Sequence, residues 1–209
     1  MAAKKKADLK VIIMGDYAVG KTSFICRYIE GKFKTQEPTI GAAFFLKQWG
    51  PYNIAVWDTA GDERYTGLSN FYCRNAGVAI LAFDINNVKT FESLWARFTP
   101  LLESANKDCL VVIVGTKLDL VTPESREILV EEGKKLSMEL NEHIDTSTLS
   151  RPPYFETSSL NGHNVKDVFE FVFQHCLPLS DSQRKNQHVS NTVDLYESTK
   201  TNSSKKKCC

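Results

Sequence analysis

The segment at residues 15–22, Gly-Asp-Tyr-Ala-Val-Gly-Lys-Thr, constrains the fold of this chain more than any other, because it fits the pattern G-x-x-x-x-G-K-[ST]. The apolar run Leu9–Met14 precedes it, and side chains compatible with a helix follow from Lys21 to Glu30. In this context the glycines let backbone N–H groups turn inward around phosphate oxygens, and the helix N-terminus adds partial positive charge. We therefore expect a phosphate-binding loop between a strand and a helix.

Two side chains of this loop carry chemistry. Lys21 can reach the β- and γ-phosphates of a nucleotide, and the Thr22 hydroxyl can ligate Mg²⁺. Kinases and ATPases share such a loop, so the motif alone selects neither the base nor the reaction. The residues expected to contact the nucleotide here are Gly15, Asp16, Tyr17, Ala18, Val19, Gly20, Lys21, Thr22 and Ser23.

Strand and helix patterns alternate along the chain and predict an α/β fold. The near-continuous apolar runs Val78–Asp84 and Leu110–Thr116 are typical of buried parallel strands. Residues 43–49 and 52–58 flank the turn pair Gly50-Pro51 and indicate an antiparallel hairpin. A helix is also expected around residues 127–142. Two further helices are indicated by apolar stripes expected to face the core: Phe91, Leu94, Trp95, Phe98, Leu101 and Leu102, and Val165, Val168, Phe169, Val172, Phe173 and Cys176.

The length of 209 residues suits one domain, which we place at residues 9–177 after an extension at 1–8. Residues 178–209 are polar and are expected to form a disordered tether. The net charge of +1 argues against nucleic-acid binding, and no apolar run approaches the roughly 20 residues that span a bilayer. The four cysteines within the domain (Cys26, Cys73, Cys109 and Cys176) are interpreted as buried thiols rather than disulfides or metal ligands.

A second apolar strand, at residues 53–58, ends in the carboxylate of Asp58. This position suits a Mg²⁺ site, reached through water because Mg²⁺ keeps much of its hydration shell. Gly61 follows closely and can offer a backbone N–H to the γ-phosphate, which a side chain at this position would obstruct.

Several segments together resemble the Rab family of small GTPases. Residues 57–61, Trp-Asp-Thr-Ala-Gly, with Glu63-Arg64-Tyr65 are similar to that family's W-D-T-A-G-Q-E-R-[FY] segment. Residues 38–41 with Phe44 resemble its switch I, and residues 71–76 resemble its Y-Y-R-G-A helix. The resemblance implies a small G domain with a mostly parallel six-stranded sheet, one antiparallel edge strand and helices on both faces.

The resemblance also implies how the nucleotide is recognised. Thr39 would meet Mg²⁺ and the γ-phosphate only in the GTP state, completing a metal set of Thr22, Thr39 and Asp58. Phe33 would lean on the guanine ring. Asp119, in a segment resembling N-K-x-D, would accept two hydrogen bonds from guanine, which adenine does not offer there. The further residues implied at the base are Thr116, Lys117, Ser158, Ser159 and Leu160.

Two departures from the family pattern leave the catalytic rate open. Asp62 stands where these GTPases usually have glutamine, and it is shorter and only accepts hydrogen bonds when ionised. Tyr17 adds bulk where an arginine finger approaches. Lys21, Thr39 and Asp62 are the candidate catalytic residues. The sequence therefore fits an ordinary switch enzyme that hydrolyses GTP, or a slow or GAP-insensitive GTP-bound module that recruits partners to a membrane.

The chain ends in Lys-Lys-Lys followed by Cys208 and Cys209, which resemble the Rab double-cysteine prenylation signal. Two lipid chains anchor a protein stably, whereas one does so only marginally. The resemblance implies a monomer that meets an exchange factor, a GAP, a dissociation inhibitor, a prenylation escort and effectors through its switches. Residues 42–49, Asp62 and the stretched region 121–153 resemble the Rab-twenty branch, which implies endosomal or phagosomal membranes, with the Golgi as the alternative, and cycling with the cytosol.

Overall fold

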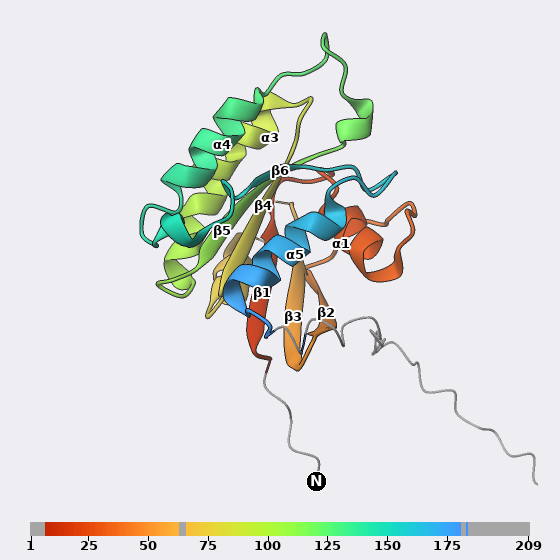
Figure 1. Ribbon diagram of the computed structural model, residues 1–209. Coiled ribbons are helices and arrows are strands. Elements are labelled where there is room, and N and C mark those ends of the chain that lie inside the picture. The colour runs from red at the N-terminus through yellow and green to blue at the C-terminus, as the bar shows by residue number, and fades with distance from the viewer. Residues whose placement is uncertain (1–6, 63–65, 181–182, 184–209) are drawn as a thin grey trace, which may run out of the picture.

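The computed structural model describes residues 7–62, 66–180 and 183, without the side chains of residues 66–69. Strands and helices alternate along the chain, as the sequence predicts (Figure 1). The strands are β1 Leu9–Met14, β2 Ala42–Trp49, β3 Tyr52–Thr59, β4 Val78–Asp84, β5 Leu110–Thr116 and β6 Tyr154–Glu156. The α-helices are α1 Lys21–Glu30, α2 Thr66–Cys73, α3 Val88–Ser93, α4 Val130–Glu139 and α5 Val165–Cys176.

One sheet of six strands holds the molecule together, in the order β2-β3-β1-β4-β5-β6. The edge strand β2 pairs antiparallel to β3, and all other neighbours are parallel. This confirms the predicted small G domain sheet with one antiparallel edge strand. Gly50, with a φ of 53°, supplies the left-handed residue that the β2–β3 turn requires.

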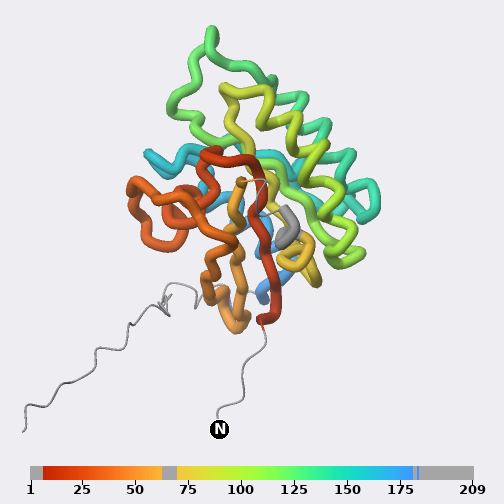
Figure 2. The backbone as a smooth tube through the Cα atoms, turned by 180° about the vertical axis from the view of Figure 1, so that it is seen from behind, coloured from red at the N-terminus to blue at the C-terminus, as the bar shows by residue number. Residues whose placement is uncertain are grey.

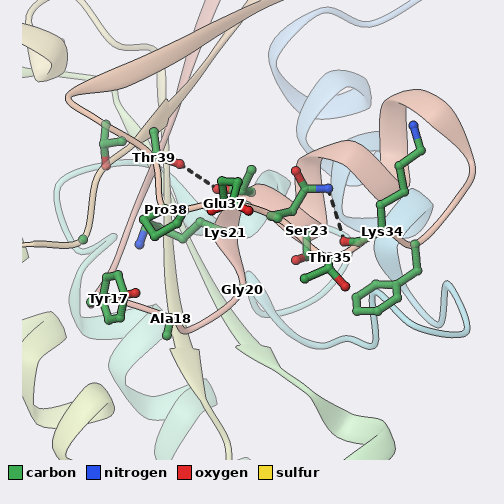
Figure 3. Close-up of a pocket in the computed structure, with 15 residues that line it drawn as sticks. Tyr17, Ala18, Gly20, Lys21, Ser23, Lys34, Thr35, Glu37, Pro38 and Thr39 are labelled. Carbon is green, nitrogen blue, oxygen red and sulfur yellow. Dashed lines mark hydrogen bonds between the residues drawn. The ribbon is translucent and has the colours of Figure 1, made fainter.

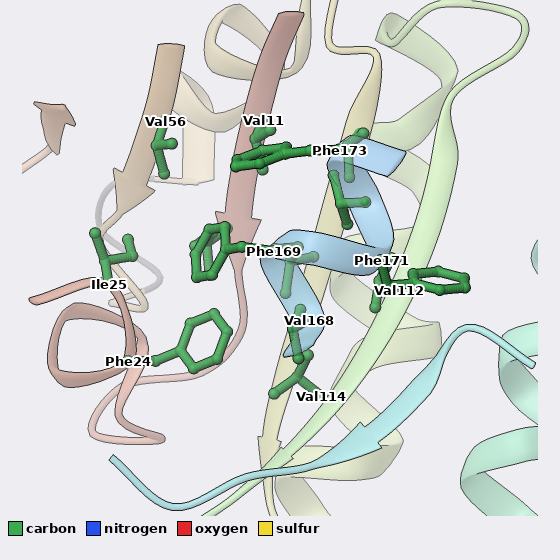
Figure 4. Close-up of a cluster of buried hydrophobic side chains, with 14 of the residues drawn as sticks. Val11, Phe24, Ile25, Val56, Val112, Val114, Val168, Phe169, Phe171 and Phe173 are labelled. Atoms are coloured by element: carbon green, nitrogen blue, oxygen red, sulfur yellow. The ribbon is translucent and has the colours of Figure 1, made fainter. Parts of the chain in front are cut away.

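Helices cover both faces of this sheet. Alternate residues of β1 point to opposite sides, so Val11 and Ile13 belong to one buried cluster while Ile12 and Met14 belong to the other. α1 and α5 complete the first cluster, where Phe24 of α1 stacks on Phe169 of α5 (Figure 4). α2, α3 and α4 supply the second, and Figure 2 shows α3 and α4 side by side from behind.

The predicted elements agree closely with the observed ones. The Gly50-Pro51 hairpin is confirmed, and α4 lies within the helix expected around residues 127–142. Cys26, Cys73 and Cys109 are buried free thiols, while Cys176 is half-buried at the end of α5. Among the residues that the structure describes, no helix is both long and apolar enough to cross a bilayer.

One member of the predicted core stripe after residue 90 is wrong. Trp95 is 58% exposed, whereas its neighbours Leu94 and Phe98 are buried. The prediction assumed regular α-helical spacing, but the helix changes to a π-helix at Leu94–Phe98 and to a 3₁₀-helix at Thr99–Ser104. The wider π turn alters which side chains face the sheet, and it leaves Trp95 outside.

The parallel strands all end at the same edge of the sheet. The loops that follow β1, β3, β5 and β6 therefore lie close together at this edge, and they contain the segments that the sequence singles out. Ligands of open α/β sheets bind in this position, outside the carboxyl ends of the strands.

Candidate nucleotide-binding site

The loop at residues 15–20 connects β1 to α1 and begins the site. Gly20 has a φ of 96° and directly precedes α1, so the free N–H groups of the helix N-terminus lie at the loop. Gly15 is required by close packing, since an added Cβ would lie 2.1 Å from the Ala82 carbonyl oxygen of β4. The loop has the geometry of a cradle for phosphate.

Lys21 occupies the interior of this loop. Its Nζ donates to the carbonyl oxygens of Gly15 over 2.8 Å and of Asp16 over 2.7 Å, and its side chain is buried. Burial lowers the pKa of Lys21 to about 8, although the carboxylates of Asp58 and Asp16 oppose this shift. A negatively charged group entering the loop would therefore meet an ammonium group that is held by backbone carbonyls.

Three oxygen-bearing side chains from separate segments meet beside the loop. Thr22 Oγ1, on α1, donates to Asp58 Oδ2 over 2.7 Å. Thr39 Oγ1, in the loop before β2, lies 3.0 Å from the same carboxylate oxygen and 2.8 Å from Thr22 Oγ1. The structure thus brings together the three residues predicted to hold a metal.

The second oxygen of Asp58 gives a test of whether Mg²⁺ fits here. Asp58 Oδ1 is buried and accepts no hydrogen bond from any residue that the structure describes. Burial raises the pKa of Asp58 against the opposing effects of Thr22 and Lys21. Mg²⁺ is a hard cation that takes oxygen ligands and commonly uses one or two protein side chains with phosphate and water. An unsatisfied buried carboxylate oxygen beside two hydroxyls fits that preference.

A cleft of about 300 Å³ opens between the loop and the segment that precedes β2 (Figure 3). Its walls include Tyr17, Lys21, Phe33 and Thr39. Gly61 also lines it and packs tightly, because an added Cβ there would lie 2.4 Å from the Asp16 carbonyl and the Tyr17 nitrogen. The other wall residues are Pro38 and Thr59, which belong to the family motifs but were not predicted to contact the nucleotide, and Lys34, Thr35, Gln36 and Glu37, which no motif indicates.

The predicted base-reading residues lie on the loops after β5 and β6. Asp119 Oδ1 accepts a hydrogen bond from the Ser158 hydroxyl over 2.5 Å, so these loops are linked. Lys117 adopts a left-handed φ of 60°, and its Nζ lies 2.7 Å from Asp84 Oδ2 at the end of β4. The first contact links the loops after β5 and β6, and the second links the loop after β5 to the end of β4.

Thr116 connects the base-reading segment to the phosphate loop. Its hydroxyl lies 2.6 Å from the Val19 carbonyl oxygen and 2.8 Å from that of Phe83, and its side chain is buried. The Thr116 hydroxyl at the end of β5 can therefore connect the loop after β5 to the phosphate loop.

Several of the predicted residues, Asp119 among them, are open to solvent. Phe33 is 46% and Leu160 54% exposed, while Ser159 and Asp62 are half-buried. Phe33 lines the cleft at the phosphate loop, whereas Ser159 and Leu160 lie on the loop after β6. The predictions for Glu63, Arg64, Tyr65, Cys208 and Cys209 lie outside the described residues.

An ion pair that no sequence motif indicates joins the segment after β5 to the end of β6. Arg126 donates two hydrogen bonds to the carboxylate of Glu156, at 2.6 and 2.8 Å, and the Tyr154 hydroxyl donates a third at 2.7 Å. Burial alone would raise the pKa of Glu156, but the bonds from Arg126 and Tyr154 outweigh it and lower that pKa. The partners lie 30 residues apart, so no local pattern reveals them.

Replacing Glu156 with glutamine should lower the free energy of unfolding by about 1–2 kcal/mol at neutral pH, because a charged bidentate contact is lost. A lowered folded-state pKa stabilises above the ordinary glutamate pKa, and this stabilisation disappears as the pH falls through the lowered value. Urea unfolding across the acid range, with bound nucleotide held in the same excess, measures the difference. A difference in the free energy of unfolding between the two proteins that stays constant with pH would contradict this account.

Comparison with known proteins identifies the family of this chain. The Ras family model matches residues 10–177. The human protein "Ras-related protein Rab-20" is 34% identical over 98% of this chain and 99% of its own length. The mouse protein of that name is also 34% identical, over the same shares. "Ras-related protein Rab7" of Cenchrus ciliaris is 33% identical over 93% of this chain and 94% of its own length.

Proposed function

Because this chain belongs to the Rab branch of the Ras family of small GTPases, a GTP-hydrolysing switch of vesicle traffic, we propose that the cleft between the phosphate loop and residues 33–39 holds the triphosphate of GTP. The observation that carries this assignment is the meeting of Thr22, Thr39 and Asp58 beside the buried Lys21.

Lys21 and the backbone N–H groups of residues 15–20 bind the β- and γ-phosphates, with the N-terminus of α1 adding favourable charge. Thr22, Thr39 and Asp58 hold Mg²⁺, which when bound neutralises developing charge on the phosphate oxygens. The Gly61 N–H donates to the γ-phosphate. Loss of the γ-phosphate removes a partner from both Thr39 and Gly61, so hydrolysis releases the two segments that contain these residues, which are the switches.

Asp119 selects guanine, because its carboxylate accepts from the N1–H and the exocyclic amine. The Ser158 hydroxyl fixes the orientation of that carboxylate. The Ser159 N–H reads guanine O6, and Lys117, Leu160 and Phe33 cover the base. Thr116 keeps this half in register with the phosphate loop through Val19.

Switch-dependent partners bind over the aromatic surface that joins β2, β3 and α2. Phe44 contacts Trp57 at 5.1 Å between ring centroids, and Trp57 contacts Tyr72 at 5.6 Å. Ile40 and Phe71, on either side, are 81% and 64% exposed. This surface adjoins both switches, so we assign to it the effectors, exchange factor, GAP and dissociation inhibitor that a Rab GTPase requires.

The chain reaches membranes through prenylation of Cys208 and Cys209, aided by an escort protein. Leu179 is buried, and an added Cβ on Gly50 would lie 2.8 Å from its side chain, so residue 179 lies beside the β2–β3 turn. Endosomal or phagosomal membranes are the proposed destination, with the Golgi as the alternative. The protein acts as a monomer.

A nucleotide-binding experiment tests the proposed function. Purified chain should bind GDP and a non-hydrolysable GTP analogue in the presence of Mg²⁺, and ATP at least a thousandfold more weakly, on the order of what a buried hydrogen-bonding site discriminates. Chelation of Mg²⁺ should accelerate nucleotide release, and Lys21→Ala should abolish tight binding. Equal affinity for ATP, or no binding of either guanine nucleotide, would overturn the assignment.

A second proposal concerns the rate. Asp62 directly follows Gly61, and Tyr17 is 61% exposed on the phosphate loop where an arginine finger would approach. The negative charge of an ionised Asp62 beside the γ-phosphate opposes the transition state of hydrolysis. The Tyr17 ring at the entrance of the cleft hinders the approach of a GAP. These residues support a long-lived GTP-bound form that recruits partners to its membrane.

A further inference from the structure

One arginine reaches the phosphate loop from a segment that is distant in the sequence. Arg97 Nη1 donates to Asp16 Oδ1, and the two residues are 81 positions apart in the sequence. Their side chains are 33% and 16% exposed, so the ion pair is partly shielded from solvent and salt. Arg97 thereby ties the helix that follows β4 to the loop that follows β1.

This contact comes from an irregular turn of helix. Arg97 belongs to the π-helix Leu94–Phe98 that continues α3, the same turn that leaves Trp95 exposed. A π turn is rare, and such turns occur frequently at functional sites. Here the turn coincides with the point where the helix contacts the phosphate loop.

Asp16 links this arginine to two parts of the nucleotide site. Its carboxylate accepts from Arg97, while its backbone carbonyl accepts from Lys21 Nζ over 2.7 Å. The same carbonyl group lies against Gly61, where an added Cβ would be 2.4 Å away. A shift of Asp16 would therefore change the position of Lys21 and the packing of Gly61 together.

We propose that Arg97 is a positioning residue for the γ-phosphate half of the site, acting through Asp16. By holding the Asp16 carboxylate it fixes the carbonyl that positions Lys21, and it maintains the backbone surface on which Gly61 packs. This inference rests on the proposed function, in which Gly61 meets the γ-phosphate. Because GDP lacks that phosphate, loss of the ion pair weakens triphosphate binding more than diphosphate binding.

The test compares release rates from the full-length protein. With Mg²⁺ present, Arg97→Gln should release a non-hydrolysable GTP analogue about fivefold faster relative to GDP, the scale of one partly exposed ion pair. Arg97→Lys, which keeps the charge, should show a smaller acceleration of analogue release than Arg97→Gln. Lys89→Gln removes an exposed charge from the same helix and should leave both rates unchanged.

A double-mutant cycle with Asp16→Asn asks whether Arg97 acts through Asp16. If it does, Arg97→Gln has little further effect on the ratio of release rates in the Asp16→Asn background. Additive effects, or equal acceleration of both nucleotides, would overturn the inference while leaving the proposed function intact. Failure of the unaltered protein to bind either guanine nucleotide would instead overturn the proposed function. If Arg97→Gln does not fold, Arg97→Lys and Asp16→Asn decide the question, since both must shift the ratio in the same direction.

Discussion

Replacing Asp119 with asparagine should lower the affinity for GDP and GTP by about a thousandfold or more, the scale on which a buried hydrogen-bonding site rejects a mismatched ligand. Guanine presents two N–H donors to this carboxylate, and an amide would turn one acceptor into a donor. Xanthine carries an oxygen where guanine carries the exocyclic amine, so the variant should gain affinity for xanthosine diphosphate. Competition against a fluorescent nucleotide measures all three ligands.

The substitution is suited to the site because Asp119 keeps a local partner. The Ser158 hydroxyl donates to its Oδ1, and an asparagine carbonyl oxygen can accept the same bond, so the loops should stay in place. Asp108→Asn, which removes an exposed carboxylate just before β5, serves as the matched control and should bind GDP normally. GDP affinity within roughly threefold of the unaltered protein would remove Asp119 from the base site, since the loss of a hydrogen bond to a charged group costs more than that.

The sheet and the phosphate loop could be predicted from the sequence because their signals are local. β4 and β5 are continuous apolar runs, and the β2–β3 turn is marked by Gly50-Pro51. Each signal depends only on residues within one element or turn, where spacing and side-chain type determine the outcome. The burial of Trp95 was predicted wrongly because a π turn changes the spacing of the side chains. The residue types around Trp95 do not indicate such a turn.

The contacts that hold the site in place could not be predicted in the same way. The bonds from Thr116 to the Val19 carbonyl, from Arg97 to Asp16 and from Arg126 to Glu156 join segments 97, 81 and 30 positions apart. The paired residues become neighbours only when the strands take their order in the sheet. From the sequence alone, a charged residue on a helix is interpreted as exposed to solvent. Motif residues are therefore identified by sequence, whereas the residues that position them require the fold.

Replacing Asp62 with glutamine should raise the intrinsic rate of GTP hydrolysis by about 10- to 100-fold. Glutamine can both donate to and accept from the attacking water, whereas an ionised aspartate only accepts and is one methylene shorter. Its charge also opposes the transition state, since like charges about 4 Å apart at an effective dielectric near 20 repel by about 4 kcal/mol, an upper figure for a partly wet site. Single-turnover phosphate release from GTP-loaded protein measures the change.

Asp62→Asn separates the reach of the side chain from its charge and hydrogen-bonding character, because it removes the charge and adds an N–H donor but keeps the short side chain. If charge and donation dominate, Asp62→Asn should recover much of the rate gained by Asp62→Gln, whereas if reach dominates it should stay close to the unaltered protein. Tyr17→Ser is a separate test, since it should affect hydrolysis stimulated by a GAP more than the intrinsic rate. An unaltered protein that already hydrolyses GTP as fast as Asp62→Gln would show that another group positions the water, and the proposal of a long-lived GTP-bound form would then fail.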